Sequence, residues 1–190
     1  MALAEAILVC LTEKPMSGYD LAKSFDASVG FFWRASHQQI YRELAKLRAK
    51  DLVESQEISQ SGKPNRIVHT ITDAGREVVH QWSKKQPRLP SIKDDLILKF
   101  YAFDDIDLTA MAEQMSHRIE QHQARLQTYL KIKARYYDGQ DLDAIKTGKL
   151  FALEMGIENE KGQIRVFTDA LAKMPSVPTL SPTAKIHTIK

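Results

Sequence analysis

Residues 36–50 read SHQQIYRELAKLRAK, and this stretch decides the fold of the first half of the chain. Ser36 is a favoured helix N-cap, and at 100° per residue the apolar side chains that follow it fall on one side of a helix. These side chains are Ile40, Leu44 and Leu47. The opposite side is polar or small and holds Gln38, Arg42, Ala45 and Ala49, with Gln39 and Lys46 alongside. The pattern predicts an amphipathic helix over 37–50 with one buried face.

Two short strands are predicted after this helix. Segment 66–71 is rich in β-branched residues on alternating sides, and segment 52–59 precedes it as a possible partner strand. The loop between them, QSGKPN at 60–65, contains the glycine and proline that mark a long turn. We therefore expect a two-stranded hairpin with a polar, basic tip at 60–66.

Helices are predicted on both sides of these elements. Residues 2–12 are apolar on nearly every helical face, with Glu5 as the only outlet to water, and such a helix is expected to be buried. A second short helix is expected over 18–25 and a fourth over 72–82. The order helix, helix, helix, hairpin, helix is that of a winged helix-turn-helix domain, which we place at residues 1–86.

Beyond the prolines at 87 and 90 the sequence is helical in pattern, and 91–174 is predicted to be a helical dimerisation domain. A helix is expected over 91–103, followed by two long antiparallel helices whose apolar residues alternate spacings of three and four. Each long helix would span about 45 Å, and two alone are too thin to bury both faces, so a second chain is expected to cover them. The side chains assigned to the dimer seam are Met115, Ile119, Leu126, Tyr129, Leu153, Ile157, Ile164, Phe167 and Leu171.

The net charge is too small to make the whole chain a nucleic-acid binder. Lys and Arg number 27 against 24 Asp and Glu, a formal net charge of +3, so a DNA-binding surface has to be a local patch. Residues 34–50 contain five basic side chains and one acidic one, a local charge of +4. The basic side chains are Arg34, Arg42, Lys46, Arg48 and Lys50, and the hairpin tip adds Lys63 and Arg66. Basic charge is therefore concentrated on the predicted third helix and wing.

The remaining composition bounds the compartment and the end of the chain. Cys10 is the single cysteine, which excludes a disulfide within the chain and favours a reducing compartment. The apolar run 6–11 is far shorter than the ~20 residues of a membrane span. A cytoplasmic protein without membrane contact is expected. Segment 175–190 has three prolines and no acidic residue and is expected to be a disordered tail.

Individual residues are assigned to DNA contacts by their chemistry. Side chains in the first half of the third helix are expected to read base edges, because Gln suits adenine and Arg suits guanine. These are Gln38, Gln39 and Arg42. Basic residues near them are expected to bind phosphates, which fixes position without reading sequence. These are Arg34, Lys46, Lys63 and Arg66. Tyr19 and Tyr41 also lie within reach of phosphates, although packing is the expected role of their rings.

Four motifs in the first 80 residues resemble the PadR family of bacterial transcriptional regulators. They are SGYDL at 17–21, SHQQIYREL at 36–44, GKPNR at 62–66 and ITDAGR at 71–76. Many members carry Gly and a small hydroxyl residue before the recognition-helix Tyr and Pro after it. Gln38, Gln39 and Arg42 occupy those places here, which resembles the branch of the virulence-gene activator AphA, with its large helical C-terminal domain. The resemblance implies a homodimeric DNA-binding regulator on a pseudo-palindromic operator, and it fixes neither the target genes nor the sign of regulation.

The aromatic and Met side chains of the long helices admit two interpretations. Some members of the resembled family bind phenolic ligands, which would make these side chains an effector pocket. A stripe at helical spacing is more often simple core packing. The side chains in question are His122, Tyr129, Tyr136, Tyr137, Phe151, Met155 and Phe167.

Catalysis and an adaptor role are the two alternatives to DNA binding. No catalytic residue, cofactor or metal is predicted, since His117 and His122 are five apart on a helix and Gly62-Lys63 lacks the rest of a P-loop. A helical adaptor that uses the winged domain for protein contacts stays open, because such domains are reused in that way. Salt-dependent retention on DNA separates a regulator from an adaptor.

Overall fold

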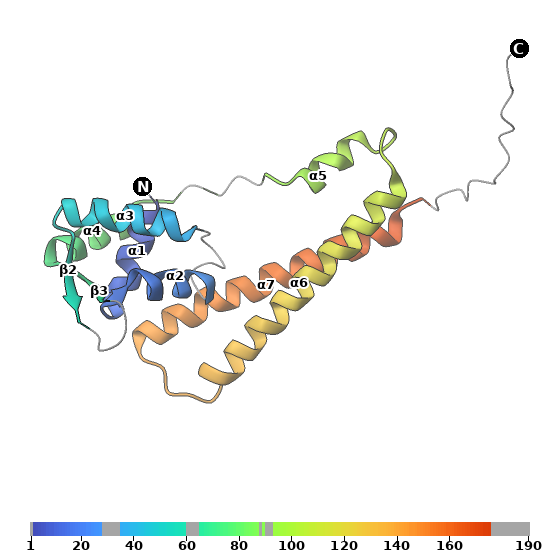
Figure 1. Ribbon diagram of the computed structural model, residues 1–190. Coiled ribbons are helices and arrows are strands. Elements are labelled where there is room, and N and C mark those ends of the chain that lie inside the picture. The colour runs from blue at the N-terminus through green and yellow to red at the C-terminus, as the bar shows by residue number, and fades with distance from the viewer. Residues whose placement is uncertain (1, 28–34, 60–64, 88, 90–92, 176–190) are drawn as a thin grey trace, which may run out of the picture. The chain divides into compact units, whose positions relative to one another are not determined.

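The computed structural model describes residues 2–27, 35–59, 65–87, 89 and 93–175 (Figure 1). The chain divides into two compact units, residues 1–90 and 91–190, which are described separately. The predicted fold class is confirmed, since the first unit is a winged helix-turn-helix domain with a small sheet and the second contains two long helices. No helix in the described ranges is long and apolar enough to cross a membrane.

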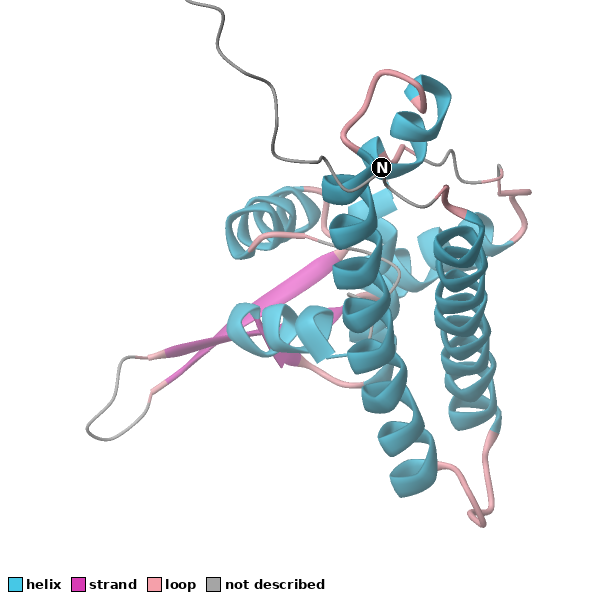
Figure 2. Ribbon diagram, turned by 90° about the vertical axis from the view of Figure 1, so that its right-hand side faces the viewer, coloured by secondary structure: helices cyan, strands magenta, loops and turns pink. Residues whose placement is uncertain are grey.

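The first unit combines helices with a small antiparallel sheet. Its elements are α1 (Ala2–Glu13), β1 (Met16–Ser17), α2 (Gly18–Ala27), α3 (His37–Ala49), β2 (Val53–Ile58), β3 (Arg66–Ile71) and α4 (Asp73–Ser83). The strand order is β1-β3-β2, and Figure 2 shows β2 and β3 as the longer pair that forms the wing. The predicted third helix and both predicted strands are therefore present, within one or two residues of the expected ends.

Strand β1 is an addition to the predicted two-stranded hairpin. Met16 pairs with His69 and Ser17 with Val68, so the segment before α2 is bonded to the inner strand of the wing. A strand of only two residues is too short to show the alternation of apolar and polar side chains by which strands are recognised in a sequence. Its pairing partners also lie about 50 positions later in the chain. The pairing places the start of α2 beside the base of the wing.

One hydrophobic core holds α1, α2, α3 and the sheet together. Its fully buried side chains include Ile7, Leu8, Leu21, Phe25, Ile40 and Leu44. Burial of each such side chain contributes about 1.5–3 kcal/mol relative to exposure. The face of α3 predicted to be buried is the buried one, and this core fixes which face of α3 points to solvent.

The prediction that Glu5 is the water-exposed residue of α1 is wrong. Its side chain is buried, and its Oε2 has no hydrogen-bond partner among the described residues, whereas Val9 on the same helix is 40% exposed. The reason is its position, since Glu5 lies one turn before Leu8 on the rim of the buried face. The other part of the prediction holds, because α1 is buried on most of its surface.

Gly75 in the first turn of α4 is expected to tolerate no side chain. A Cβ there would lie 2.3 Å from the backbone oxygen of Leu52 and 2.7 Å from Cγ1 of Ile71. Gly75→Ala should therefore lower the free energy of unfolding of the first unit by about 1–3 kcal/mol, the usual cost of overpacking. Arg76→Ala, at the exposed next position, should stay within about 0.5 kcal/mol in the same urea titration. Equal stability of both variants would contradict the close packing of α4 on the sheet.

The second unit begins with a shorter helix than predicted. Its elements are α5 (Asp95–Lys99), a 3₁₀ turn η2 (Phe100–Ala102), α6 (Leu108–Tyr136) and α7 (Ala144–Lys173). In place of a helix over 91–103, α5 starts after Asp94, which caps it and accepts two hydrogen bonds from Arg118 of α6 at 2.6 and 3.2 Å. The Arg118 hydrogen bond is the main cause that holds the pKa of Asp94 below its usual value. The ion pair fixes α5 on α6 and thereby sets where the helix begins.

Helices α6 and α7 pack on each other within one chain. Most of the side chains assigned to the dimer seam are buried in this pair or partly covered by it, including Met115, Tyr129, Leu153, Ile157 and Phe167. The three-and-four spacing thus marks a seam within one chain, and a role of these residues in a dimer interface stays a prediction. Of the aromatic residues considered for an effector, Tyr129 and Phe167 are inside the pair and Tyr136 and Phe151 are exposed.

The seam contains a buried polar pair. Nδ1 of His122 on α6 contacts Oε2 of Glu160 on α7, and Nη1 of Arg125 donates to the other carboxylate oxygen at 3.2 Å. Glu160 is 2% exposed, and the His122 ring stacks on Phe167 with 6.3 Å between ring centroids. This pair fixes the register of α6 on α7, because sliding one helix along the other would leave the buried Glu160 carboxylate without its partners.

Candidate nucleic-acid interface

Helix α3 begins at a reciprocal cap that also uses one of the predicted base-reading residues. The backbone N–H of Gln39 donates to Oγ of Ser36 at 3.3 Å, and the backbone N–H of Ser36 donates to Oε1 of Gln39 at 2.8 Å. Such a capping box satisfies two otherwise unpaired helix-terminal donors. A base contact by Gln39 would therefore use its amide nitrogen, or it would require the cap to open.

The outer face of α3 is free of the core along its whole length. Its exposed side chains are Gln38, Gln39, Tyr41, Arg42, Ala45, Lys46, Arg48 and Ala49. Two alanines between long polar side chains leave room for close approach of a partner surface. Lys46 forms an ion pair with Glu43 at 2.9 Å, which neutralises part of its charge in the free protein. Arg42 stands on this face without an ion-pair partner among the described residues.

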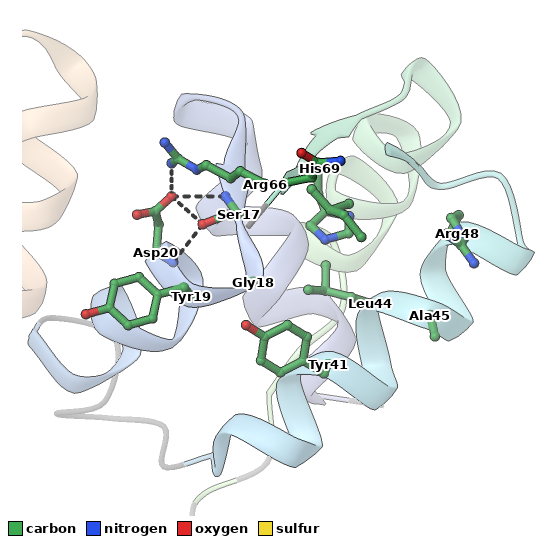
Figure 3. Close-up of a pocket in the computed structure, with 12 residues that line it drawn as sticks. Ser17, Gly18, Tyr19, Asp20, Tyr41, Leu44, Ala45, Arg48, Arg66 and His69 are labelled. Carbon is green, nitrogen blue, oxygen red and sulfur yellow. Dashed lines mark hydrogen bonds and ion pairs between the residues drawn. The ribbon is translucent and has the colours of Figure 1, made fainter. Parts of the chain in front are cut away.

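A groove of about 880 Å³ runs between the start of α2, the middle of α3 and the base of the wing (Figure 3). Its lining residues are Ser17, Gly18, Tyr19, Asp20, Tyr41, Leu44, Ala45, Arg48, Asn65, Arg66, Ile67 and His69. The structure thus brings Tyr19, Tyr41 and Arg66, three of the predicted contacts, to one surface.

The two tyrosines are more exposed than their expected packing role implies. Tyr19 is 63% and Tyr41 51% exposed, so both rings present most of their edge and hydroxyl to solvent. Gly18 makes the position of Tyr41 possible, because a Cβ on Gly18 would lie 2.4 Å from Cε1 of that ring. The rings therefore stand where α2 meets α3 and form part of the groove.

Arg48 and His69 lie on the side of the groove away from α2. Nδ1 of His69 is 2.8 Å from Oγ of Ser55 across the β2–β3 ladder. Burial, and to a lesser extent the charge of Arg48, lower the pKa of His69 below its usual value. His69 is therefore neutral at neutral pH, and the positive charge on this side is that of Arg48.

The wing joins the groove through Arg66. Nη2 of Arg66 donates to Oδ2 of Asp20, which also accepts hydrogen bonds from the hydroxyl and backbone N–H of Ser17 at 2.6 and 3.1 Å (Figure 3). The hydrogen bond from the Ser17 hydroxyl is the main cause of the lowered pKa of Asp20, with Arg66 adding to it. Arg66 thus lies at the surface beside the first turn of α2, as a phosphate contact requires.

Some predicted contacts lie outside the described residues, and some lining residues were not predicted. Arg34 and Lys63 fall in the ranges 28–34 and 60–64, which the structure does not describe. Arg48 and Asn65 were missed as site residues. Arg48 could have been predicted from its spacing, since it follows Tyr41 by seven residues and therefore lies on the same side of the helix. Asn65 donates to Oε1 of Glu57 at 2.7 Å, a cross-strand contact that only the hairpin register shows.

Comparison with known proteins agrees with this architecture in both units. Residues 7–81 match the Transcriptional regulator PadR-like family, and residues 92–174 match the family called Virulence activator alpha C-term. A Mycobacterium tuberculosis protein described as a probable transcriptional regulator, Rv1176c, is 34% identical over 175 residues, which cover 86% of this chain and 93% of that protein.

Two solved structures extend the similarity to nearly the whole chain. Bacillus subtilis PadR in complex with operator DNA superposes with a TM-score of 0.81 at 25% identity, covering 91% of this chain and 98% of that one. The same protein has also been solved with p-coumaric acid. The Vibrio cholerae virulence activator AphA superposes with a TM-score of 0.73 at 29% identity, covering 90% and 96%. The chain therefore belongs to the PadR-like family of transcriptional regulators, and its second unit is of the virulence activator type.

Proposed function

We propose that this regulator binds DNA sequence-specifically as a homodimer, with α3 in the major groove and the wing on the backbone or in the minor groove. The observation that carries the proposal is the exposed face of α3, where Gln38 and Arg42 share one side of the helix with Ala45 and Ala49. Ile40 and Leu44 anchor the opposite side in the core. Amide and guanidinium groups read base edges, and small residues allow the helix to enter the groove. Such a protein acts in the bacterial cytoplasm.

The arrangement of the groove supports the same orientation. Arg48 and Arg66 place one guanidinium group on each side of the groove, and the rings of Tyr19 and Tyr41 also line it. In helix-turn-helix proteins the helix before the recognition helix crosses the DNA backbone. The start of α2 and the base of the wing, which the contact between Asp20 and Arg66 joins, would therefore face phosphates together beside the α3 contact. The operator complex of Bacillus subtilis PadR, which is similar over 91% of the chain, supports DNA as the partner.

The test is binding of the chain to duplex DNA over a series of salt concentrations. When a protein neutralises several phosphates, the logarithm of its binding constant falls linearly with the logarithm of salt concentration, with a slope of about −0.9 per phosphate. We expect a steep slope on random duplex and an additional, less salt-sensitive gain on the operator. A protein that binds no duplex at low salt would favour the adaptor function instead.

An exposed apolar stripe on α7 is the surface we propose for dimerisation. Phe151, Met155 and Val166 are between 58 and 73% exposed and lie within about 60° of one another around the helix. Gly148 and Gly162 have open space above them on the same side. The stripe lies away from the intrachain seam, so a second chain can cover it without unpacking α6 from α7. A two-fold dimer would present α3 to two half-sites.

Met155→Glu is expected to weaken the dimer by at least an order of magnitude, because it buries a carboxylate in an apolar contact without a partner. Light scattering over a dilution series should show the wild-type protein at twice the chain mass of 21.6 kDa and the variant moving towards that mass. Thr168→Glu adds the same charge at an exposed position on another side of α7 and should leave the mass unchanged. A wild-type protein that stays monomeric over the whole dilution series would contradict the proposed homodimer.

A further inference from the structure

We propose that Asp20 is a positioning residue for DNA binding, which holds the guanidinium group of Arg66 in place at the base of the wing. The inference rests on the proposed function, since it concerns how a phosphate contact is arranged. Asp20 lies in the first turn of α2, and Arg66 is the first residue of β3. Their contact joins the helix before the recognition helix to the wing, the two elements that would flank the DNA backbone.

The carboxylate of Asp20 is fixed independently of Arg66. Its Oδ2 accepts hydrogen bonds from the Ser17 hydroxyl and backbone N–H, and its own backbone N–H donates to Oγ of Ser17 at 3.2 Å. Ser17 is in turn bonded into the sheet through its pairing with Val68, two residues after Arg66. The acceptor therefore stands in a defined place beside the strand that carries Arg66.

Arg66 keeps capacity for a second partner while Asp20 holds it. A guanidinium group has five N–H donors, and the contact with Asp20 is made through Nη2. The side chain of Arg66 is 45% exposed, so the remaining donors are open to solvent. An arginine that is already ordered loses less conformational freedom when it binds a phosphate, which is worth about 2- to 10-fold in affinity for a long side chain. The lowered pKa of Asp20 keeps the carboxylate ionised, and thus able to hold Arg66, throughout the neutral range.

The contact between Asp20 and Arg66 could also have the opposite role, in which Asp20 weakens DNA binding, and the sign of the coupling between the two residues separates the two roles. An acidic group at a DNA-binding surface repels phosphates, and Asp20 could simply withhold Arg66 from DNA. If Asp20 positions Arg66, the arginine contributes more to affinity when Asp20 is present. If Asp20 withholds Arg66, the arginine contributes more after Asp20 is removed. The two roles therefore predict opposite coupling between the same two substitutions.

The experiment is a double-mutant cycle of D20N and R66Q in the full chain. Dissociation constants are measured on random duplex and on a duplex selected by the wild-type protein from genomic DNA. We expect R66Q to weaken binding about 2- to 10-fold more in the wild-type background than in the D20N background. We also expect R66Q to reduce the salt slope by about one phosphate. Equal losses in both backgrounds, or a larger loss with D20N, would overturn the positioning role.

Controls separate this inference from folding and from the proposed function. Asp73→Asn removes the same charge from the first turn of α4, at an exposed position, and should show no coupling with R66Q. If D20N loses its helical circular dichroism signal, Asp20→Ser repeats the cycle, because a hydroxyl oxygen at that position also accepts a hydrogen bond. A wild-type protein that binds no duplex overturns DNA binding itself, whereas a binding wild-type protein without coupling overturns only the role of Asp20.

Discussion

Arg42→Ala is expected to weaken binding to the operator by about 1–3 kcal/mol while random duplex loses much less. Arg42 lies on the exposed face of α3 in its N-terminal half, where base contacts concentrate in helix-turn-helix proteins. A bidentate arginine contact to guanine discriminates bases, and its loss therefore lowers the ratio of specific to random affinity. Fluorescence anisotropy on both duplexes at several salt concentrations measures this ratio.

Lys46→Ala is the matched control for Arg42, because both side chains are exposed on the same helix. Lys46 is expected to contact phosphate, so its removal should weaken all duplexes alike and reduce the salt slope by about one. Its ion pair with Glu43 makes the expected loss smaller than that of an unpaired lysine. An unchanged ratio of specific to random affinity in the Arg42 variant would contradict base reading by this residue.

Glu160→Ala is expected to destabilise the second unit by about 3–5 kcal/mol, the usual cost of breaking a buried ion pair. Glu160 is 2% exposed and is the shared partner of His122 and Arg125 across the α6–α7 seam. Without it, both basic side chains lose their buried acceptor, and Nε2 of His122 is already without a hydrogen-bond partner among the described residues. Urea denaturation followed by circular dichroism should show the loss as a lower midpoint.

Glu158→Ala is the control on the same helix. Its carboxylate forms an exposed ion pair with Lys161 at 2.7 Å, and such surface pairs contribute at most about 1 kcal/mol. Replacing both His122 and Glu160 with leucine should recover most of the stability that Glu160→Ala loses, because Arg125, which then lacks its acceptor, is 37% exposed and can be hydrated. If Glu160→Ala were as stable as Glu158→Ala, the polar pair would not be a structural element of the seam.

The sequence predicted the first unit well because its elements have strong periodic patterns. Ile40, Leu44 and Leu47 occur at helical spacing, and these three side chains are the buried residues of α3. Strand β1 was missed because Met16 and Ser17 are ordered by pairing with distant residues and carry no pattern of their own. Arg66 was predicted as a phosphate contact, but its hydrogen bond to Asp20 depends on tertiary structure and could not be seen in the sequence.

The second unit shows what a periodic pattern leaves undecided. Spacings of three and four identify a buried seam, but they do not say whether the covering helix belongs to the same chain or to another. The available signal for intrachain pairing was a polar residue at a seam position of each helix, His122 in α6 and Glu160 in α7. An imidazole N–H can donate a hydrogen bond that a carboxylate accepts. Helix α5 was predicted too long, since its start depends on Asp94 and the distant Arg118.

Sequencing the genomic DNA fragments that the purified protein retains tests the central claim most directly. The account predicts that the fragments share a pseudo-palindrome whose half-sites lie one or two helical turns apart, because a two-fold dimer presents α3 twice. Both the specificity of α3 and the symmetry of the dimer are then recorded in one sequence. Retention of no DNA at low salt, or of fragments with no sequence in common, would contradict the account.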